Sequence, residues 1–371
     1  MKQMTISRVG GMLSLFLFAA GGAAAMGWFP LETGDLCVAA MVCLATSGAY
    51  SKHFKGFAFS LWVGAFVMAA MFYPETFQRV GGFELKRLIV PLIQVIMFGM
   101  GTMLSLADFS RVLKMPRAVL VGMVLQFSIM PLVGAGLAAL FGFPAEVAAG
   151  VVLIGSCPGG VASNVMAFIS RGNVALSVTM TACSTIISPL LTPLMMKLLA
   201  GQYVEIEVLS MMWSITKLII FPIVAGLIAN GILRHYRLRG PWLDRLLSWL
   251  AMSAICVIIA IITSLSRDQL LTVGLSLVAT AILHNTAGYV LGYGGAWIVG
   301  LDESTRRTVA IEVGLQNGGM ASALAVNVLQ SSQAAMAPAI FGPWMNISGS
   351  VLASWWRARP AGTQQETGEA G

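Results

Sequence analysis

Two polar interruptions, each inside a long apolar stretch, carry the side chains of this sequence best suited to chemistry. The phrase Gly159-Gly160-Val161-Ala162-Ser163 recurs in the second half of the chain as Gly318-Gly319-Met320-Ala321-Ser322. Hydrocarbon penalises exposed polar groups and irregular backbone, so such breaks survive only when they are buried in protein or line an aqueous cavity. A matched pair of glycine-broken apolar segments is typical of the binding site of a secondary transporter.

Polar side chains gather around both interruptions and on two neighbouring segments. Ser177 and Thr181 are spaced i and i+4, so a helix presents both on one face. Glu312 lies well inside an apolar segment, and a carboxylate at that depth indicates a functional site by default. The candidate ligands are the side chains of Gln126, Ser163, Asn164, Ser177, Thr181, Glu312 and Gln316.

These groups offer hydroxyl, amide and carboxylate oxygens, together with the carbonyls of unwound backbone. Such hard-oxygen ligands disfavour transition metals, and one carboxylate among neutral oxygens suits Na⁺ best. The half-helices after each break would present free N–H groups and positive dipole ends to an anion. Taken singly, Ser177, Thr181 and Gln126 are also explained by helix packing or interhelical hydrogen bonds. Taken together, the polar groups lie at matching breaks in both halves of the chain, which favours a site for cations and an organic anion.

The composition is that of an integral membrane protein. Hydrophobic residues make up 57% of the chain, charged residues only 10%, and mean hydropathy is +0.84, whereas soluble domains carry roughly a quarter charged residues. The net charge of +7 comes from Lys and Arg in short loops, where they orient the protein in the lipid bilayer, so no nucleic-acid partner is expected. The five cysteines lack metal-ligand spacing, and no segment pairs a nucleophile with a base, which argues against an enzyme.

Continuous apolar runs of about the 20-residue length that crosses a bilayer predict an all-α fold of ten transmembrane helices. We place them at 57–73, 90–106, 116–140, 145–170, 173–199, 208–230, 243–264, 269–299, 303–329 and 333–356, with the fourth broken near Pro158 and the ninth near Gln316. The recurring phrase relates the third, fourth and fifth spans to the eighth, ninth and tenth. Five spans per copy is an odd number, so the second copy enters the membrane upside down.

This pattern divides the chain into a first inverted repeat at 51–200 (spans 1–5), a second at 201–358 (spans 6–10), and a disordered tail at 359–371. Residues 1–50 form an apolar extension, either a cleaved signal-like segment or an extra hairpin. Lys and Arg concentrate in the loops on one side, which predicts that both ends of the ten-helix unit are cytoplasmic. The expected location is a bacterial inner membrane.

The phrases "FGMGTML", "GSCPGGVASNVMAFISRGNVALSVTMTACSTIISPLLTPL", "IEVGLQNGGMASALA" and "NISGS" resemble the bacterial branch of the bile acid:sodium symporter family. The resemblance runs from about Ser51 to Trp356. It implies a core domain of spans 3–5 and 8–10, a panel domain of spans 1, 2, 6 and 7, and broken helices that cross. It also implies two sodium sites. The first comprises Ser163, Asn164, Ser177, Thr181 and Glu312, and the second comprises Gln126, Glu312 and Gln316 with the backbone carbonyls of Val313 and Leu315.

The expected cargo is a small organic anion, such as a bile acid or a pantothenate precursor (pantoate or ketopantoate), carried with two sodium ions by alternating access. Bacterial relatives often have Thr at the position of Val161 and His at that of Met345, which leaves Asn317 and Asn346 as the best anion ligands. Gly160 and Gly318, at the two breaks, complete the predicted substrate-binding set. A proton-coupled or facilitative anion carrier of the same fold is the alternative.

Overall fold

Helices account for nearly all of the described chain. The computed structural model describes residues 10–17, 19–20, 33–51, 58–105, 111–236 and 240–359. Within these ranges the strand content is one small hairpin, β1 (Arg79–Val80) paired with β2 (Phe83–Glu84). The hairpin turns at Gly81 and Gly82, which both take positive φ angles, as a two-residue hairpin turn requires. The predicted all-α fold is confirmed.

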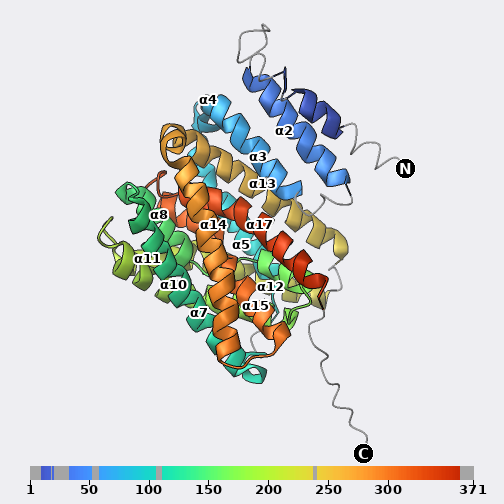
Figure 1. The fold of residues 1–371 in the computed structure, drawn as a ribbon, viewed down its shortest axis with the longest axis vertical. Helices are drawn as coiled ribbons and strands as arrows, with labels where there is room; N and C mark the ends of the chain where they lie inside the picture. Colours follow the sequence, from blue (N-terminus) through green and yellow to red (C-terminus); the bar gives the residue numbers. More distant parts are fainter. Residues whose placement is uncertain are drawn as a thin grey trace, which may run out of the picture.

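One group of helices corresponds to the predicted panel spans. It comprises α3 (Ala58–Phe72), α4 (Pro74–Gln78), η2 (Leu85–Leu88), α5 (Ile89–Met103), α11 (Val208–Ile215), η4 (Thr216–Ile220), α12 (Phe221–His235) and α13 (Pro241–Leu265). The helices α11, η4 and α12 run on as one span with a single π-helical turn, which precedes Pro222, a residue without a backbone donor. In Figure 1, α3 and α13 lie side by side, as their packing contacts also show.

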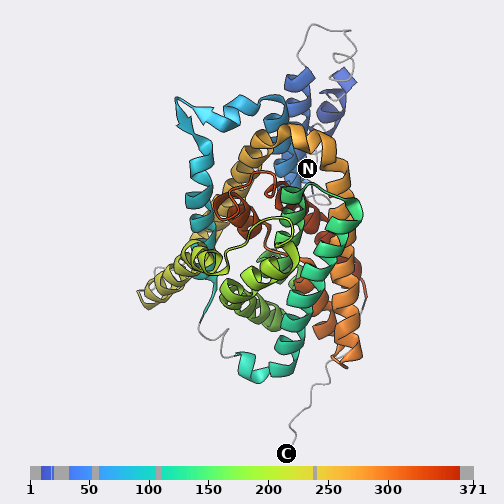
Figure 2. The same ribbon diagram turned by 90° about the vertical axis from the view of Figure 1, so that its left-hand side faces the viewer.

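The other group corresponds to the predicted core spans. It comprises η3 (Arg111–Lys114), α7 (Pro116–Phe141), α8 (Ala145–Ser156), α9 (Ala162–Ile169), α10 (Val174–Ala200), α14 (Arg267–Ile298), α15 (Glu303–Gly314), α16 (Gly318–Asn327) and α17 (Met336–Arg357). Figure 2 shows α7 and α14 running beside each other along one edge of the molecule. The predicted breaks near Pro158 and Gln316 are confirmed, because α8 and α9 are separate helices, as are α15 and α16.

Seven helices among the described residues are long and apolar enough to cross a membrane. They include the predicted spans at α5, α7, α10, α11–α12, α13 and α14. The seventh is α2 (Thr33–Tyr50), which lies in the N-terminal extension and packs beside α3 (Figure 1). The chain is thus an all-α membrane protein. The count of ten spans and the inverted relation of the two halves stay predictions.

The two ends of the chain are described only in part. Residues 10–17 and 19–20 are helical, and α2 covers the second apolar run of the predicted 1–50 extension. Gly34 in α2 approaches Phe72 and Tyr73, and the Tyr73 hydroxyl donates a hydrogen bond to the Asp35 carboxylate. The predicted disordered tail lies outside the described residues, apart from Arg359.

Candidate ion and substrate site

The two helix breaks meet and exchange backbone hydrogen bonds. Gly160 donates its N–H to the carbonyl of Leu315 at 2.8 Å, and Asn317 donates its N–H to the carbonyl of Pro158 at 2.9 Å. An antiparallel bridge therefore joins the two unwound segments. Each break leaves helix-end groups without a partner in its own helix, and the bridge satisfies part of them.

Glycine is required where the breaks approach so closely. A Cβ atom at Gly159 would lie 2.9 Å from Oε2 of Glu312, and one at Gly160 would lie 2.9 Å from the carbonyl oxygen of Gln316. Carbon and oxygen atoms in ordinary contact stay well beyond 3 Å apart. The Gly-Gly pair of the first break thus keeps the space through which Glu312 reaches the other half of the chain.

The predicted first sodium site is a compact cluster of oxygens around Glu312. Thr181 donates to Oε2 of Glu312 at 2.9 Å, and Ser177 donates to Oε1. Ser177 Oγ also lies 2.8 Å from Oδ1 of Asn164, and Ser163 Oγ lies 3.3 Å from Oγ1 of Thr181. Apart from Asn164, which is half-buried, these side chains are at most 2% exposed. All five residues predicted for this site are brought together.

The residues predicted for the second sodium site meet at the second break. Nε2 of Gln126 donates to Oε1 of Gln316 at 2.7 Å and to the carbonyl of Cys157 at 3.1 Å. Nε2 of Gln316 donates to the carbonyl of Val313 at 2.6 Å. Oε1 of Gln126 is buried and has no hydrogen-bond partner among the described residues. Such an unpaired buried acceptor is uncommon in a folded protein, and it is the kind of atom that a cation ligates.

A cavity of about 440 Å³ opens beside the breaks, between the two groups of helices. All six residues predicted to bind substrate line it: Gly160, Val161, Asn317, Gly318, Met345 and Asn346. The opposite wall comes from α3, α5 and α13 and includes Met97, Met100 and Met252. The lining is largely apolar, and the polar groups are concentrated on the side of the breaks.

Asn317 has a structural role in addition to lining the cavity. Its Oδ1 accepts the N–H of Met320 at 3.0 Å, so Asn317 is the N-cap of α16. The amide Nδ2 is the group left to face a ligand. On the neighbouring helix α17, Asn346 donates to the carbonyl of Gly342 at 2.9 Å, and Met345 Sδ accepts the N–H of Gln316 at 3.3 Å.

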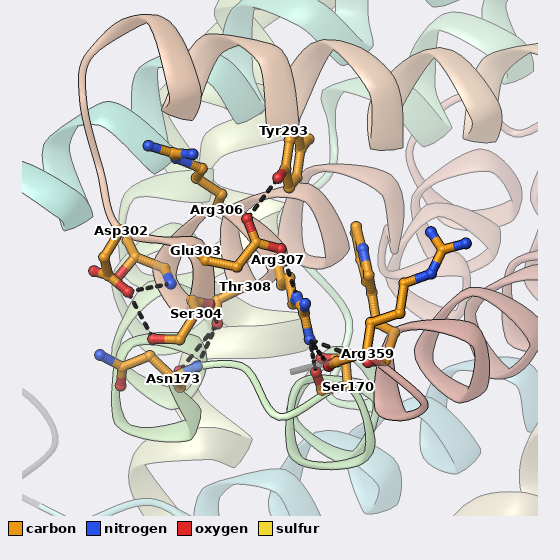
Figure 3. Close-up of polar contacts among 12 residues, drawn as sticks. Ser170, Asn173, Tyr293, Asp302, Glu303, Ser304, Arg306, Arg307, Thr308 and Arg359 are labelled. Carbon is orange, nitrogen blue, oxygen red and sulfur yellow. Dashed lines mark hydrogen bonds and ion pairs between the residues drawn. The ribbon is translucent and has the colours of Figure 1, made fainter. Parts of the chain in front are cut away.

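The helix α15 carries Glu312 near its C-terminal end. Its N-terminal end is fixed by a buried arginine, Arg307 (Figure 3). Nε of Arg307 pairs with Glu303 at 2.7 Å, and Nη1 donates to the carbonyls of Ser170, Trp356 and Arg359 at 3.1–3.2 Å. Arg307 thereby ties the start of α15 to the α9–α10 turn and to the end of α17. Because the guanidinium has several donors in a rigid plane, one side chain can hold all three segments.

Asp302 begins α15 at the same end. Its carboxylate accepts the backbone N–H of Thr305 at 3.1 Å and the hydroxyls of Thr305 and Ser304. Partial burial alone raises the pKa of Asp302, but these hydrogen bonds outweigh it and lower the pKa below its ordinary value. The charged N-cap also stabilises the positive end of the helix dipole. The start of this half-helix is thus held by specific polar contacts.

Sequence reasoning missed one buried contact next to the second break. Nδ2 of Asn285, in the middle of α14, donates to the carbonyl of Gly314 at 2.8 Å. The available signal was an asparagine inside a long apolar segment, which membrane helices seldom carry without a partner. The position of α3, α5 and α13 in the apolar wall of the cavity was not predicted either, because their lining side chains are mostly apolar and resemble those of any membrane helix.

Comparisons with known proteins identify the family of this chain. The model of the "Sodium Bile acid symporter family" matches residues 90–273. A Bacillus subtilis protein named "Uncharacterized sodium-dependent transporter YocS" is 39% identical over 305 residues, which cover 82% of this chain and 92% of that protein. The "Probable sodium/metabolite cotransporter BASS1, chloroplastic" of Arabidopsis thaliana is 33% identical, over 81% of this chain and 73% of its own. The chain belongs to the sodium bile acid symporter family of sodium-dependent membrane transporters.

Proposed function

We propose that this protein is a symporter that carries a small organic anion together with two sodium ions. The observation that carries the proposal is the position of Glu312, a residue that is 2% exposed and whose carboxylate lies in a cluster of hydroxyl and amide oxygens from two other helices, α9 and α10. An unpaired buried carboxylate is costly, and no Lys or Arg contacts it among the described residues. Sodium ions supply the missing countercharge.

The first sodium ion is assigned to Ser163, Asn164, Ser177, Thr181 and Glu312. Ser177 Oγ lies within hydrogen-bond distance of both Glu312 and Asn164, yet a hydroxyl has one proton to donate. When Glu312 is ionised, one of these oxygen pairs approaches without a shared proton, and a cation bound among the oxygens removes that repulsion. The ligands are all neutral except the carboxylate, which suits a monovalent ion.

The second sodium ion is assigned to Gln126, Glu312, Gln316 and the carbonyls of Val313 and Leu315. The unpaired Oε1 of Gln126 supports this assignment. The carbonyls near the end of α15 have no helical donors of their own. Rotation of the Gln316 amide, which now donates to Val313, would turn a second oxygen toward the ion.

The cavity next to the breaks is the proposed substrate site. Asn317 and Asn346 provide amide donors on one side, and the remaining lining is mostly methionine, isoleucine and glycine. This lining favours an organic anion whose charged group faces the breaks and whose body is apolar. A bile acid and a pantothenate precursor both have the required carboxylate. The apolar wall favours the bile acid, whose body is the more apolar of the two.

We place the protein in a bacterial inner membrane with both ends of the ten-helix unit cytoplasmic, on the basis of the Lys and Arg content of its loops. Two inverted repeats at 51–200 and 201–358 would bring the equivalent breaks together at the middle of the membrane. The bridge between Gly159 and Gln316 supports this relation.

Thermal unfolding of the purified protein tests the proposal. The protein would be heated with sodium chloride or choline chloride, alone and with each of a panel of organic anions. A ligand present at 100 times its Kd stabilises the folded state by about 2.7 kcal/mol. We expect stabilisation by sodium alone and a further shift by the true substrate only when sodium is present. Equal stabilisation by an anion in choline and in sodium would favour the proton-coupled alternative if uptake follows a pH gradient, and the facilitative alternative if it does not.

A further inference from the structure

The side chain of Asn285 is completely buried at the point where α15 ends. Its Nδ2 donates to the carbonyl of Gly314, the last residue of that helix, at 2.8 Å. A carbonyl in the last turn of a helix has no donor within the helix. In an apolar interior, such a group must find a partner elsewhere. Asn285 therefore supplies, from α14, the hydrogen bond that the helix break removes.

Asn285 is in turn held by two hydroxyl groups. Ser348, on α17, donates to Oδ1 of Asn285, and the hydroxyl of Tyr289 lies 3.1 Å from Oγ of Ser348. Since the single proton of Ser348 is directed to Asn285, the Tyr289 hydroxyl must donate to Ser348. A second acceptor for Ser348, the carbonyl of Met345, is more distant at 3.2 Å. The hydrogen bonds thus run in one direction, from Tyr289 to the backbone of the second break.

The backbones of α14 and α15 are in contact at the same level. A Cβ atom at Gly288 would lie 2.9 Å from Cα of Gly314, and one at Gly314 would lie 2.3 Å from the ring of Tyr289. There is consequently no room for Gly314 to move toward α14. The packing fixes the position of the peptide, while Asn285 fixes the direction of its carbonyl.

We propose that Asn285 is a positioning residue for the second sodium site, and that Ser348 and Tyr289 hold it in place. The inference rests on the proposed function, because Gly314 lies between Val313 and Leu315, the two residues whose carbonyls are assigned to that ion. A peptide chain that turns at Gly314 aims the carbonyls on either side of it. Without the Asn285 donor, the Gly314 carbonyl seeks another partner, and the neighbouring carbonyls rotate away from the ion.

The same contacts join the sodium site to the wall of the cavity. Ser348 lies on α17 three residues after Met345, close to one helical turn, and both Met345 and the following Asn346 line the cavity. Met345 also accepts the backbone N–H of Gln316. The helix that contacts the substrate is therefore bonded to the second break at two points. One of these connections runs from Ser348 through Asn285 to the carbonyl of Gly314.

The test measures the sodium concentration that gives half of the maximal thermal stabilisation, with choline keeping the ionic strength constant. The full-length protein would be compared with Asn285→Leu, which keeps the branched shape without the amide, and with Ser348→Ala, Ser348→Thr and Tyr289→Phe. The matched control is Asn230→Leu. Asn230 is also buried and also donates from Nδ2 to a helix-end carbonyl, that of Leu104 at 2.9 Å, but on α12, away from the breaks.

We expect Asn285→Leu to raise the half-maximal sodium concentration roughly tenfold, as for the loss of one buried hydrogen bond. Ser348→Ala and Tyr289→Phe should raise it by roughly three- to fivefold, and Ser348→Thr, which keeps the donor, should restore the wild-type value. Asn230→Leu should lower the melting temperature without sodium and leave the half-maximal concentration unchanged.

An unchanged sodium dependence in Asn285→Leu, together with a loss of melting temperature like that of Asn230→Leu, would show that Asn285 is only structural. If Asn285→Leu does not fold, Ser348→Ala and Tyr289→Phe decide, and wild-type sodium dependence in both overturns the proposal. A wild-type protein that sodium does not stabilise at all would overturn the proposed function and this assignment with it.

Discussion

Gly160 donates its backbone N–H to the carbonyl of Leu315, although the two residues belong to opposite halves of the chain. The contact joins the first helix break to the second and places the carboxylate of Glu312 beside the hydroxyl groups of Ser163 on α9 and of Ser177 and Thr181 on α10. Neither half contains a complete site. The oxygen cluster exists only where both breaks are unwound and held together, which links the proposed ion sites directly to the way the two halves pack.

Gly160→Ala should therefore destabilise the protein and weaken sodium binding. Its Cβ atom would lie 2.9 Å from the carbonyl oxygen of Gln316, and overpacking of this kind costs about 1–3 kcal/mol. The matched control is Gly136→Ala in α7, where a Cβ atom meets nothing within 4 Å. That change should be neutral or stabilise by up to about 1 kcal/mol through helix propensity. Thermal unfolding with and without sodium measures both effects, and equal melting temperatures for the two variants would contradict the prediction.

Glu312→Ala should abolish sodium-dependent uptake, because Glu312 faces both proposed ions. Removing it leaves two cations without a formal countercharge in an apolar surrounding, which costs several kcal/mol. Glu312→Gln tests the charge at nearly constant volume and should behave in the same way. Glu84→Gln, which alters an exposed ion pair with Arg79 and Arg87, should transport normally. Full sodium-driven uptake by either Glu312 variant in proteoliposomes would refute the ion assignment.

The sequence predicted those parts of this architecture that depend on local pattern. Apolar run length located the helices to within a few residues, and the Gly-Gly pairs located both breaks. The side chains of Ser163, Ser177 and Glu312 converge as the family resemblance implied. The partners of Asn285 and Arg307 were not predictable, since a polar residue inside a span shows that it needs a partner but not which helix supplies it.

Asn317 should bind substrate through its amide nitrogen while its oxygen caps α16. Asn317→Ala removes both contacts, so Asn317→Ser is the sharper variant, because serine keeps an N-cap acceptor and loses the amide donor. We expect weaker binding of the anion and unchanged stabilisation by sodium alone. Asn327→Ala is the control, as Asn327 lies in the same helix and its amide bonds to Ala323. Loss of the sodium effect with retained anion binding would instead place Asn317 in an ion site.

Arg307→Met should lower stability by about 3 kcal/mol, because it removes a buried guanidinium that pairs with the half-buried Glu303 and leaves three carbonyls without this donor. The control, Arg79→Met, breaks an exposed pair with Glu84 and should cost less than about 1 kcal/mol. Replacing Glu303 by Gln in the Arg307→Met background should recover part of the loss. Unfolding midpoints of the four proteins, including the wild type, check the order, and similar losses in the two single variants would contradict it.

Transport of a monoanion should be electrogenic. Two sodium ions and the Glu312 carboxylate give the loaded site a net charge of +1, and the bound anion brings it to zero. The empty carrier returns with the carboxylate that it had at the start, so each cycle moves one positive charge inward. A membrane potential of 100 mV contributes about 2.3 kcal/mol for each charge moved.

The measurement is uptake into proteoliposomes with equal sodium on both sides and an imposed potassium diffusion potential. An inside-negative potential should drive accumulation of the anion, and reversing it should drive efflux. The single variant Gln126→Leu removes a ligand assigned to the second ion only. If it reduces coupling to one sodium per anion, its remaining uptake becomes insensitive to the potential while still requiring sodium. Wild-type uptake of a monoanion that ignores the potential would rule out two-sodium coupling, although one sodium bound at Glu312 would still be consistent with it.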